Sequence, residues 1–167
     1  IPEDAAWLTA GEPTNIGGAT CVELTAAANE GGVRKTTVTF KTTVDGKDYI
    51  AMADVEQAGA IKAVTVAEFL AAAEGTSLYE LTGVVKNIKS TTYGNFDIVD
   101  ATGSVYVYGL TNNGAVGSND KTFASLGINE GDKVTIVGTR ASYNGTAQVG
   151  GPAYLVAHTA AQAATIA

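Results

Sequence analysis

The alternation of apolar and polar residues between positions 79 and 158 is the strongest pattern in the chain. Five short runs place apolar residues at every second position, and turn-forming glycine, asparagine or aspartate residues separate most of them. A period of two is typical of strands with one buried face. The expected strands are residues 81–88, 94–100, 104–110, 133–140 and 146–156.

Two short helices are expected beside these strands. Thr65 and Glu68 have the spacing of a capping box, residues 69–73 continue the helix, and Gly75 ends it. A second helix is expected at residues 121–126, between the third and fourth strands. Three strands, a helix and two further strands are the plan of an OB-fold, a small five-stranded barrel.

The N-terminal third of the chain shows no helical periodicity. It alternates in several runs, and Asp45-Gly46 is a hairpin signal. We expect three or four strands that form part of an Ig-like β-sandwich. The alternating runs are residues 22–27, 34–42 and 49–57.

The fold class expected for the whole chain is all-β, with two domains. Small residues around Gly59 place the boundary near position 60. The first domain is the partial Ig-like sandwich of residues 1–60. The second is the OB-fold domain of residues 61–167, which ends in an Ala-rich tail.

The charge of the chain bears on its partners. The formal net charge is −7, of which residues 1–60 carry −5 and the remainder −2. Neither part has the basic surface that phosphate backbones require, so nucleic acid is disfavoured as a partner. No run approaches the roughly 18 apolar residues of a transmembrane helix, so we expect no membrane insertion by this chain.

The motifs of common enzymes are missing from the sequence. It has one cysteine, Cys21, and one histidine, His158, and it lacks a phosphate-binding loop, a nucleophile elbow and a Cys/His cluster. Asp97 and Asp100 are three residues apart on an expected strand, so they face opposite sides and make a poor acid/base pair. We expect a non-enzymatic chain without metal or cofactor.

The outer face of the expected barrel carries the candidate binding residues. Side chains alternate along a strand, so if the valines of the third strand are buried, Tyr106 and Tyr108 point outwards. The same alternation on the second strand exposes Asn95 and Asp97. OB-folds bind ligands on this face, where aromatic rings stack on bases and serve sugar rings equally well. The alternative is that the tyrosines pack beneath the N-terminal domain or a loop.

Loop residues extend this candidate site. The alternative for all of them is a solvated rim of turn-forming residues. They are Lys86, Lys89 and Tyr93, between the first two strands or at their ends, and Arg140, Tyr143 and Asn144, in the same position for the last two.

Residues 65–158 resemble the OB-fold domains of exported proteins from Bacteroidetes-type bacteria. The order and combination of the matching segments are fairly specific for the fold and carry no information about the ligand. The segments are 64–70 (VTVAEFL), 81–85 (LTGVV), 93–96 (YGNF), 100–103 (DATG), 107–109 (VYG) and 131–134 (GDKV).

Residues 7–60 resemble the later part of a BACON domain, an Ig-like module of surface and carbohydrate-active proteins in the same bacteria. The matches are Trp7-Leu8, Ala28-Asn29, Arg34 with the alternating Thr and Val residues after it, and residues 57–59. The first strands of that family, which precede the position of Trp7, have no counterpart in this sequence. A glycan or mucin role is inferred for the family.

These patterns and resemblances together imply a non-catalytic binding or adhesion module of an exported bacterial surface protein, with a glycan bound on the barrel face. The location implied is extracellular, cell-surface or periplasmic, with a lipid anchor supplied by a segment outside this chain. Two alternatives stay open: a single-stranded nucleic-acid binder that uses the same face, and a structural spacer without a small ligand. The sequence makes no prediction of oligomeric state.

Overall fold

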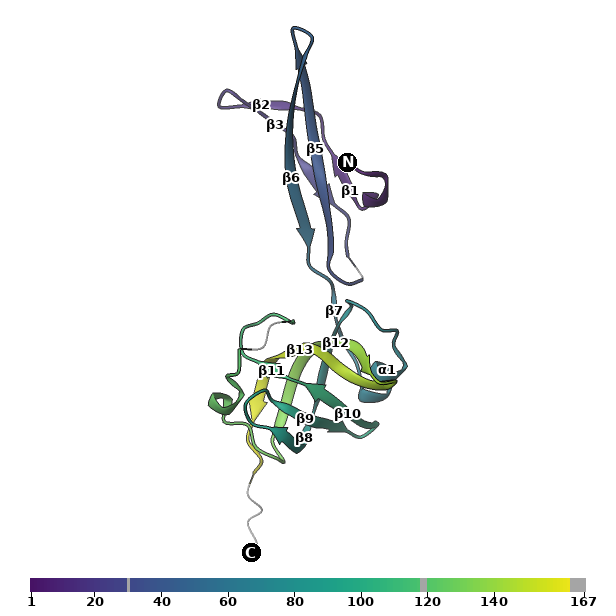
Figure 1. The fold of residues 1–167 in the computed structure, drawn as a ribbon, viewed down its shortest axis with the longest axis vertical. Helices are drawn as coiled ribbons and strands as arrows, with labels where there is room; N and C mark the ends of the chain where they lie inside the picture. Colours follow the sequence, from purple (N-terminus) through teal and green to yellow (C-terminus); the bar gives the residue numbers. More distant parts are fainter. Residues whose placement is uncertain (30, 118–119, 163–167) are drawn as a thin grey trace, which may run out of the picture. The chain divides into compact units, whose positions relative to one another are not determined.

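The computed structural model describes residues 1–29, 31–117 and 120–162. The structure is mostly β. The chain divides into two compact units, Ile1–Gly59 (unit 1) and Ala60–Ala167 (unit 2), drawn as ribbons in Figure 1. The end of the expected C-terminal tail, residues 163–167, lies outside the described residues.

Unit 1 forms its strands in separate antiparallel pairs, β1 with β4, β2 with β3, and β5 with β6. Within the described residues these pairs do not join into one sheet, so the Ig-like sandwich expected from the sequence is not confirmed. The elements are η1 (Glu3–Ala5), β1 (Leu8–Ala10), β2 (Thr14–Ile16), β3 (Ala19–Cys21), β4 (Leu24–Ala26), β5 (Arg34–Val44) and β6 (Lys47–Gln57).

The hairpin of β5 and β6 is the longest feature of unit 1. The two strands pair in register from Arg34↔Gln57 to Val44↔Lys47. Asp45 and Gly46 connect them with φ angles of 50° and 75°. Positive φ at both central residues is the mark of a type I′ turn, whose twist matches that of the strands. The hairpin expected from Asp45-Gly46 is confirmed.

Arg34 ties the N-terminal strands of unit 1 to this hairpin. Its guanidinium carbon lies 4.5 Å from the centre of the Trp7 ring. Its Nε donates to Gln57 Oε1 at 2.8 Å, and its Nη2 donates to the Ala27 carbonyl at 2.7 Å. Trp7, which is partly buried, therefore packs under a cation that is itself held in place by hydrogen bonds.

Unit 2 is a closed barrel of five long strands. Neighbouring strands follow the order β10-β9-β8-β12-β13, and β10 also pairs with β13, which closes the ring (Figure 1). The elements are β7 (Ile61–Ala63), α1 (Val66–Ala71), β8 (Leu78–Ser90), β9 (Asn95–Asp100), β10 (Gly103–Tyr108), β11 (Leu110–Thr111), η2 (Phe123–Leu126), β12 (Lys133–Tyr143) and β13 (Thr146–Thr159).

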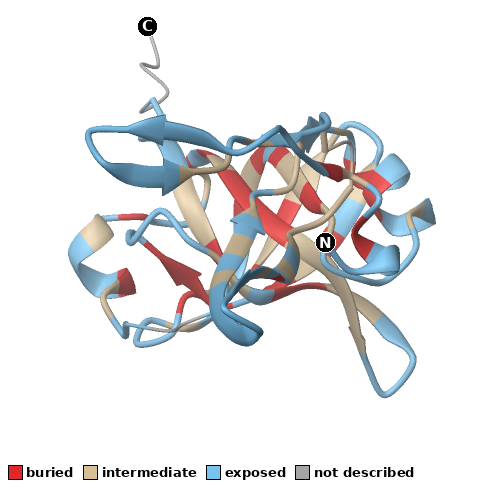
Figure 2. Ribbon diagram, turned by 90° about the horizontal axis from the view of Figure 1, so that it is seen from above, coloured by how far each residue is buried: buried red, intermediate tan, exposed pale blue. Residues whose placement is uncertain are grey.

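The barrel interior is the hydrophobic core of unit 2, and Figure 2 shows buried residues concentrated there. Val105 and Val107 of β10 are 3% and 0% exposed, and Phe96 and Ile98 of β9 are both 0% exposed. Their sequence neighbours on the same strands are partly or fully exposed. The alternation expected on these two strands is confirmed.

Helix α1 begins at the expected capping box. The Thr65 hydroxyl accepts from the Glu68 N–H, and the Glu68 carboxylate accepts from the Thr65 N–H. Asp100, in the turn between β9 and β10, accepts from the Val66 N–H at 2.8 Å and fixes the helix to that turn. Val66 and Phe69 pack into the core, whereas Leu70 is 36% exposed.

The second expected helix, at residues 121–126, is wrong in type and extent. Only Phe123–Leu126 are helical, and they form a 3-10 helix. Lys121 and Gly127 bracket it with φ angles of 58° and 67°. Residues with positive φ cannot continue a right-handed helix, so the helix is confined to one turn.

Asp132 fastens the end of β13 to the barrel. Its carboxylate accepts from the Ala161 N–H, the Asn129 N–H and His158 Nε2, each at 2.8 Å. The side chain is buried, and these hydrogen bonds lower the pKa of the Asp132 carboxyl from 3.8 to about 2. The partner His158 lies 26 positions away along the chain, so no local pattern signals this cluster.

We expect Asp132→Asn to destabilise unit 2 above pH 3.8, because the amide cannot accept all three hydrogen bonds. A carboxyl whose pKa is lower in the folded than in the unfolded state stabilises the fold above the unfolded value. That contribution is lost as the pH falls from 3.8 to about 2. Urea unfolding of both proteins along a pH series checks this. Stability curves that stay equally far apart down to pH 2 would contradict it.

Gly83 lets β8 pass close to β9. A Cβ at this position would lie 2.7 Å from the Val99 carbonyl oxygen and 2.8 Å from Ile98 Cγ1. We expect Gly83→Ala to lower the free energy of unfolding by about 1–3 kcal/mol, the usual cost of overpacking. Gly103→Ala is the matched control, because its Cβ would meet only Val66 Cγ1 at 3.4 Å. Equal loss in both variants, measured by urea unfolding, would refute the explanation.

Candidate ligand-binding face

Strand register places the candidate residues in two rows across β8, β9 and β10. One row is Lys86, Asp97 and Tyr106, and the other is Ser90, Asn95 and Tyr108. Directly paired residues on neighbouring strands point to the same side of a sheet. We call Tyr93, Asn95, Asp97, Tyr106 and Tyr108 the tyrosine face, with Lys86 and Lys89 at its edge.

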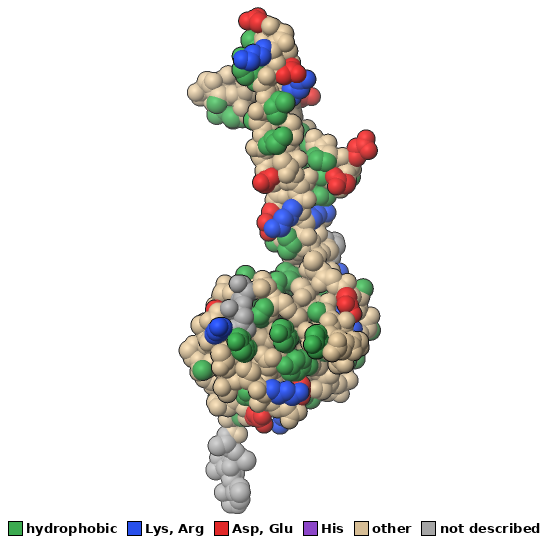
Figure 3. Space-filling model, viewed as in Figure 1, with side chains coloured by type: hydrophobic (Ala, Val, Ile, Leu, Met, Phe, Trp, Pro, Cys, Tyr) green, Lys and Arg blue, Asp and Glu red, His purple; other side chains and the backbone are tan. Residues whose placement is uncertain are grey.

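The surface over these strands is rich in apolar side-chain atoms. Figure 3 shows hydrophobic side chains gathered on the face of unit 2 turned toward the viewer, with lysine or arginine side chains near its margins. Tyr93 is 45% exposed and Tyr108 is 55% exposed. Exposed aromatic side chains indicate a binding surface more strongly than scattered aliphatic ones do, because aromatic side chains are enriched where proteins bind ligands.

Tyr106 is held in place by its neighbours. Its hydroxyl accepts a hydrogen bond of 2.8 Å from Asn95 Nδ2. The Lys89 ammonium lies 4.9 Å from the centre of the Tyr106 ring, within the range of a cation–π contact. Tyr106 is also partly buried. One of its ring faces is therefore occupied, and its hydroxyl orients Asn95.

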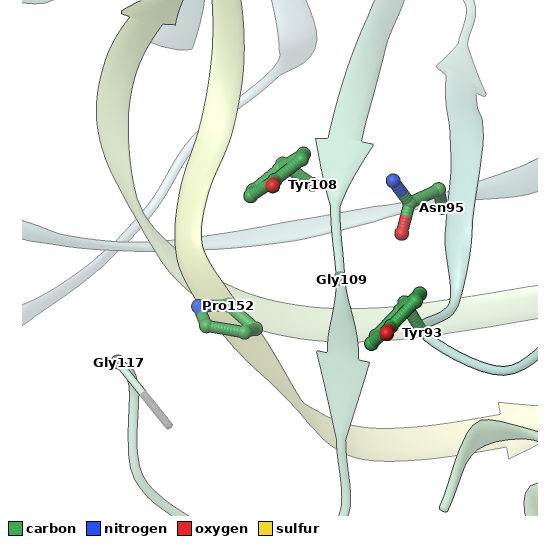
Figure 4. A pocket seen from close by; sticks show the side chains of 6 residues that line it. All are labelled: Tyr93, Asn95, Tyr108, Gly109, Gly117 and Pro152. Carbon is green, nitrogen blue, oxygen red and sulfur yellow. The ribbon is translucent and has the colours of Figure 1, made fainter. Parts of the chain in front are cut away.

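Tyr93 and Tyr108 border a hollow of about 290 Å³. Figure 4 shows the two tyrosines on opposite sides of Gly109, with Asn95 and Pro152 facing the same space. Gly109 has a φ of 91° and no side chain, so the centre of the hollow stays empty. The hollow is bordered by two rings, an amide and a proline.

Gly94 fixes the position of Tyr93. Its φ is 73°, and a Cβ on it would lie 2.5 Å from Phe123 Cδ2. The Tyr93 carbonyl accepts from the Leu110 N–H at 2.9 Å. The backbone of Tyr93 is therefore bound to the bend between β10 and β11, beside the hollow.

The two polar residues of the face differ in their bonding. Asp97 accepts from Asn87 Nδ2 at 2.8 Å. Asn95 Oδ1 is shielded from solvent and has no hydrogen-bond partner within the described residues. A buried polar atom without a partner is costly, so it is expected either to have a role or to bind an ordered water molecule.

The other predicted loop residues lie elsewhere. Arg140, 12% exposed in its side chain, donates to the Ala141 carbonyl, and its Nη1 is 3.8 Å from Glu74 Oε1. Tyr143 is 70% exposed, and Asn144, with a φ of 50°, forms the turn between β12 and β13. Within the described residues, no hydrogen bond or ion pair joins these three side chains to the tyrosine face, whereas Lys89 and Tyr93 do lie there.

Sequence reasoning missed four residues of this region. Gly109, Gly117 and Pro152 line the hollow, and the Lys121 ammonium lies 5.8 Å from the centre of the Tyr93 ring. The run Gly150-Gly151-Pro152 signals an interruption of the last strand, which is where Pro152 reaches the hollow. Nothing in the sequence signals the approach of Lys121, because it depends on the path of the loop before η2.

Among the described residues, no group of three or more His, Cys, Asp and Glu side chains is placed to hold a metal ion. None of the described helices has the length and apolar character needed to cross a membrane. No protein-family model matches the chain, and no curated protein matches it either.

We expect Tyr106→Phe to lower the free energy of unfolding by about 0.5–1.5 kcal/mol, because it leaves Asn95 Nδ2 without its acceptor. Tyr108→Phe is the control, since no hydrogen bond of its hydroxyl occurs within the described residues, and it should change stability by less than about 0.5 kcal/mol. Urea unfolding followed by circular dichroism compares the two. Equal effects would show that the Asn95–Tyr106 bond does not contribute.

Proposed function

We propose that unit 2 is an OB-fold binding module whose tyrosine face binds a glycan. The closed five-stranded barrel, with β10 paired in parallel to β13, supports the fold assignment. OB-folds bind oligosaccharides and oligonucleotides on the outer face of their second and third strands. Those strands correspond to β9 and β10, which carry the tyrosine face.

The hollow between Tyr93 and Tyr108 is the observation that carries the proposal. A sugar ring has apolar C–H faces and a rim of hydroxyl groups. Two exposed aromatic rings match its faces, and the amide of Asn95 and the carboxylate of Asp97 match its hydroxyls. Because Tyr93 and Tyr108 line the hollow, the proposal assigns stacking to them, and it assigns orientation to Tyr106 and Asn95.

The proposed role is non-catalytic. Glycoside hydrolysis needs two carboxyl groups on one cleft, and Asp97 is the one carboxylate of the tyrosine face as defined above. The module therefore serves binding or adhesion. The resemblances of both units add that the protein is exported by a Bacteroidetes-type bacterium and acts at its surface, anchored by lipid through a segment outside this chain.

A second candidate is a single-stranded nucleic acid on the same face. Lys89 over Tyr106 and Lys121 over Tyr93 favour it, because such sites combine cations with stacking rings. The net charge of −7 opposes it, since phosphate contacts dominate nucleic-acid affinity.

A glycan array run in parallel with single-stranded DNA and RNA tests both candidates. We expect glycan binding by the wild type and a loss of about 5- to 100-fold in Tyr108→Ala, from about 1–3 kcal/mol of lost stacking. Tyr143→Ala is the matched control, because Tyr143 is also exposed, at 70% against 55% for Tyr108, and lies at the end of β12, outside the tyrosine face. It should bind as the wild type does.

The outcomes separate the candidates. Binding to nucleic acid alone, weakening steeply as salt rises, would replace the glycan by the second candidate. Glycan binding that Tyr108→Ala does not change would move the site away from the tyrosine face. Absence of any ligand, with the variants still folded, would leave the structural spacer as the function of this module.

A further inference from the structure

We propose that the sugar ring bound in the hollow carries a negative charge, as a carboxylate or a sulfate. This inference rests on the proposed function and names the chemical class of its ligand. Two lysine ammonium groups approach the tyrosines of the face, Lys89 at 4.9 Å from the ring centre of Tyr106 and Lys121 at 5.8 Å from that of Tyr93. A ring that stacks beside these tyrosines places its substituents within reach of the lysines.

The backbone around the face is strained to present these side chains. Among the described residues, four non-glycine residues have positive φ, and two of them, Asp45 and Asn144, belong to hairpin turns that continue into glycine. The other two, Asn87 and Lys121, have φ angles of 50° and 58° and flank the tyrosine face. Strain of this kind persists where the structure over-determines it, and it gathers at ligand sites.

The carboxylates near the face are already engaged by uncharged donors. Asp97 accepts from Asn87, Asp120 accepts from the Thr122 hydroxyl and N–H, and Glu130 accepts from the Ile88 N–H. None of these three carboxylates lines the hollow. An anionic ring in the hollow therefore meets no carboxylate in its wall, and two lysines lie against the neighbouring tyrosines.

The lysines at the edge of the face are not neutralised by carboxylates. Lys35 and Lys41 of unit 1 form ion pairs with Glu56 and Asp48 at 2.9 Å and 2.7 Å. Lys86 and Lys89 form no ion pair within the described residues. Apart from the contact of Lys89 with the Tyr106 ring, their charge is thus available to a ligand.

The size of the hollow limits the ligand to one ring at this subsite. Its volume of about 290 Å³ is at the lower end of the ~300–1,000 Å³ of small-molecule sites. A longer chain has to leave the hollow along the face. The acidic group is accordingly on the ring that stacks, as in a uronic acid or a sulfated hexose.

Matched pairs of oligosaccharides test the inference. Each pair is a uronic-acid oligosaccharide and the same chain after reduction of its carboxyl groups to neutral alcohols. Affinities are measured by calorimetry at about 0.15 M salt, where charges more than ~8 Å apart are screened. The proteins are the wild type, Lys89→Gln, Lys121→Gln and, as a control, Lys62→Gln, which lies on β7 opposite Tyr79 near the start of β8.

We expect the wild type to bind the acidic member about 10-fold or more tightly than the neutral one. Lys89→Gln and Lys121→Gln should each reduce that preference by about 3- to 10-fold. This range covers the affinity contributed by an exposed ion pair up to that of a charge-assisted hydrogen bond. Lys62→Gln should leave the preference unchanged. Equal binding of both members, or an equal loss of preference in Lys62→Gln, would overturn the inference and leave glycan binding intact. If no oligosaccharide of any class binds, the proposed function itself fails, and the inference with it.

Discussion

The parallel pairing of β10 with β13 is the interaction on which the rest of unit 2 depends. It consists of Tyr106↔Gln148 and Val107↔Val149, and it turns a curved sheet into a closed barrel. Closure removes the two open edges and gives the inward residues of all five strands a common core, in which Val107 and Val149 are fully buried. The residues that alternate with these two valines on β10 and β13 therefore point outward.

Closure of the barrel also gives the tyrosines of the face different surroundings. Because Val107 is fixed inside, Tyr106 and Tyr108 point outward on either side of it, and register with β9 sets Tyr106 beside Asp97 and Tyr108 beside Asn95. Tyr106 is then bonded and partly covered, and Tyr108 is left open beside the hollow. A rigid barrel wall that fixes Tyr106 and leaves Tyr108 exposed beside the hollow is suited to hold a flat ligand at low entropic cost.

The sequence could predict what depends on local pattern. The side on which each residue of β9 and β10 lies, the turn at Asp45-Gly46 and the cap at Thr65 all follow from periods or turn chemistry within a few residues. It could not predict contacts that depend on how strands align. β12 and β13 shift register between Val137 and Thr139, and Arg140, just beyond that shift, lies next to Glu74. The hydrogen bond from His158 to Asp132 spans 26 positions and leaves no local signal.

The most direct test of the account is a nuclear magnetic resonance titration of the ¹⁵N-labelled chain with neutral hexoses and hexuronic acids. The side-chain amide of Asn95 gives a resolved signal at the centre of the tyrosine face. We expect that signal, and the backbone signals around Tyr93 and Tyr108, to move on addition of sugar, and to move further with the uronic acids. Signals that move only in unit 1 or in the turn at Asn144, or nowhere, would contradict a glycan site on the β9–β10 face.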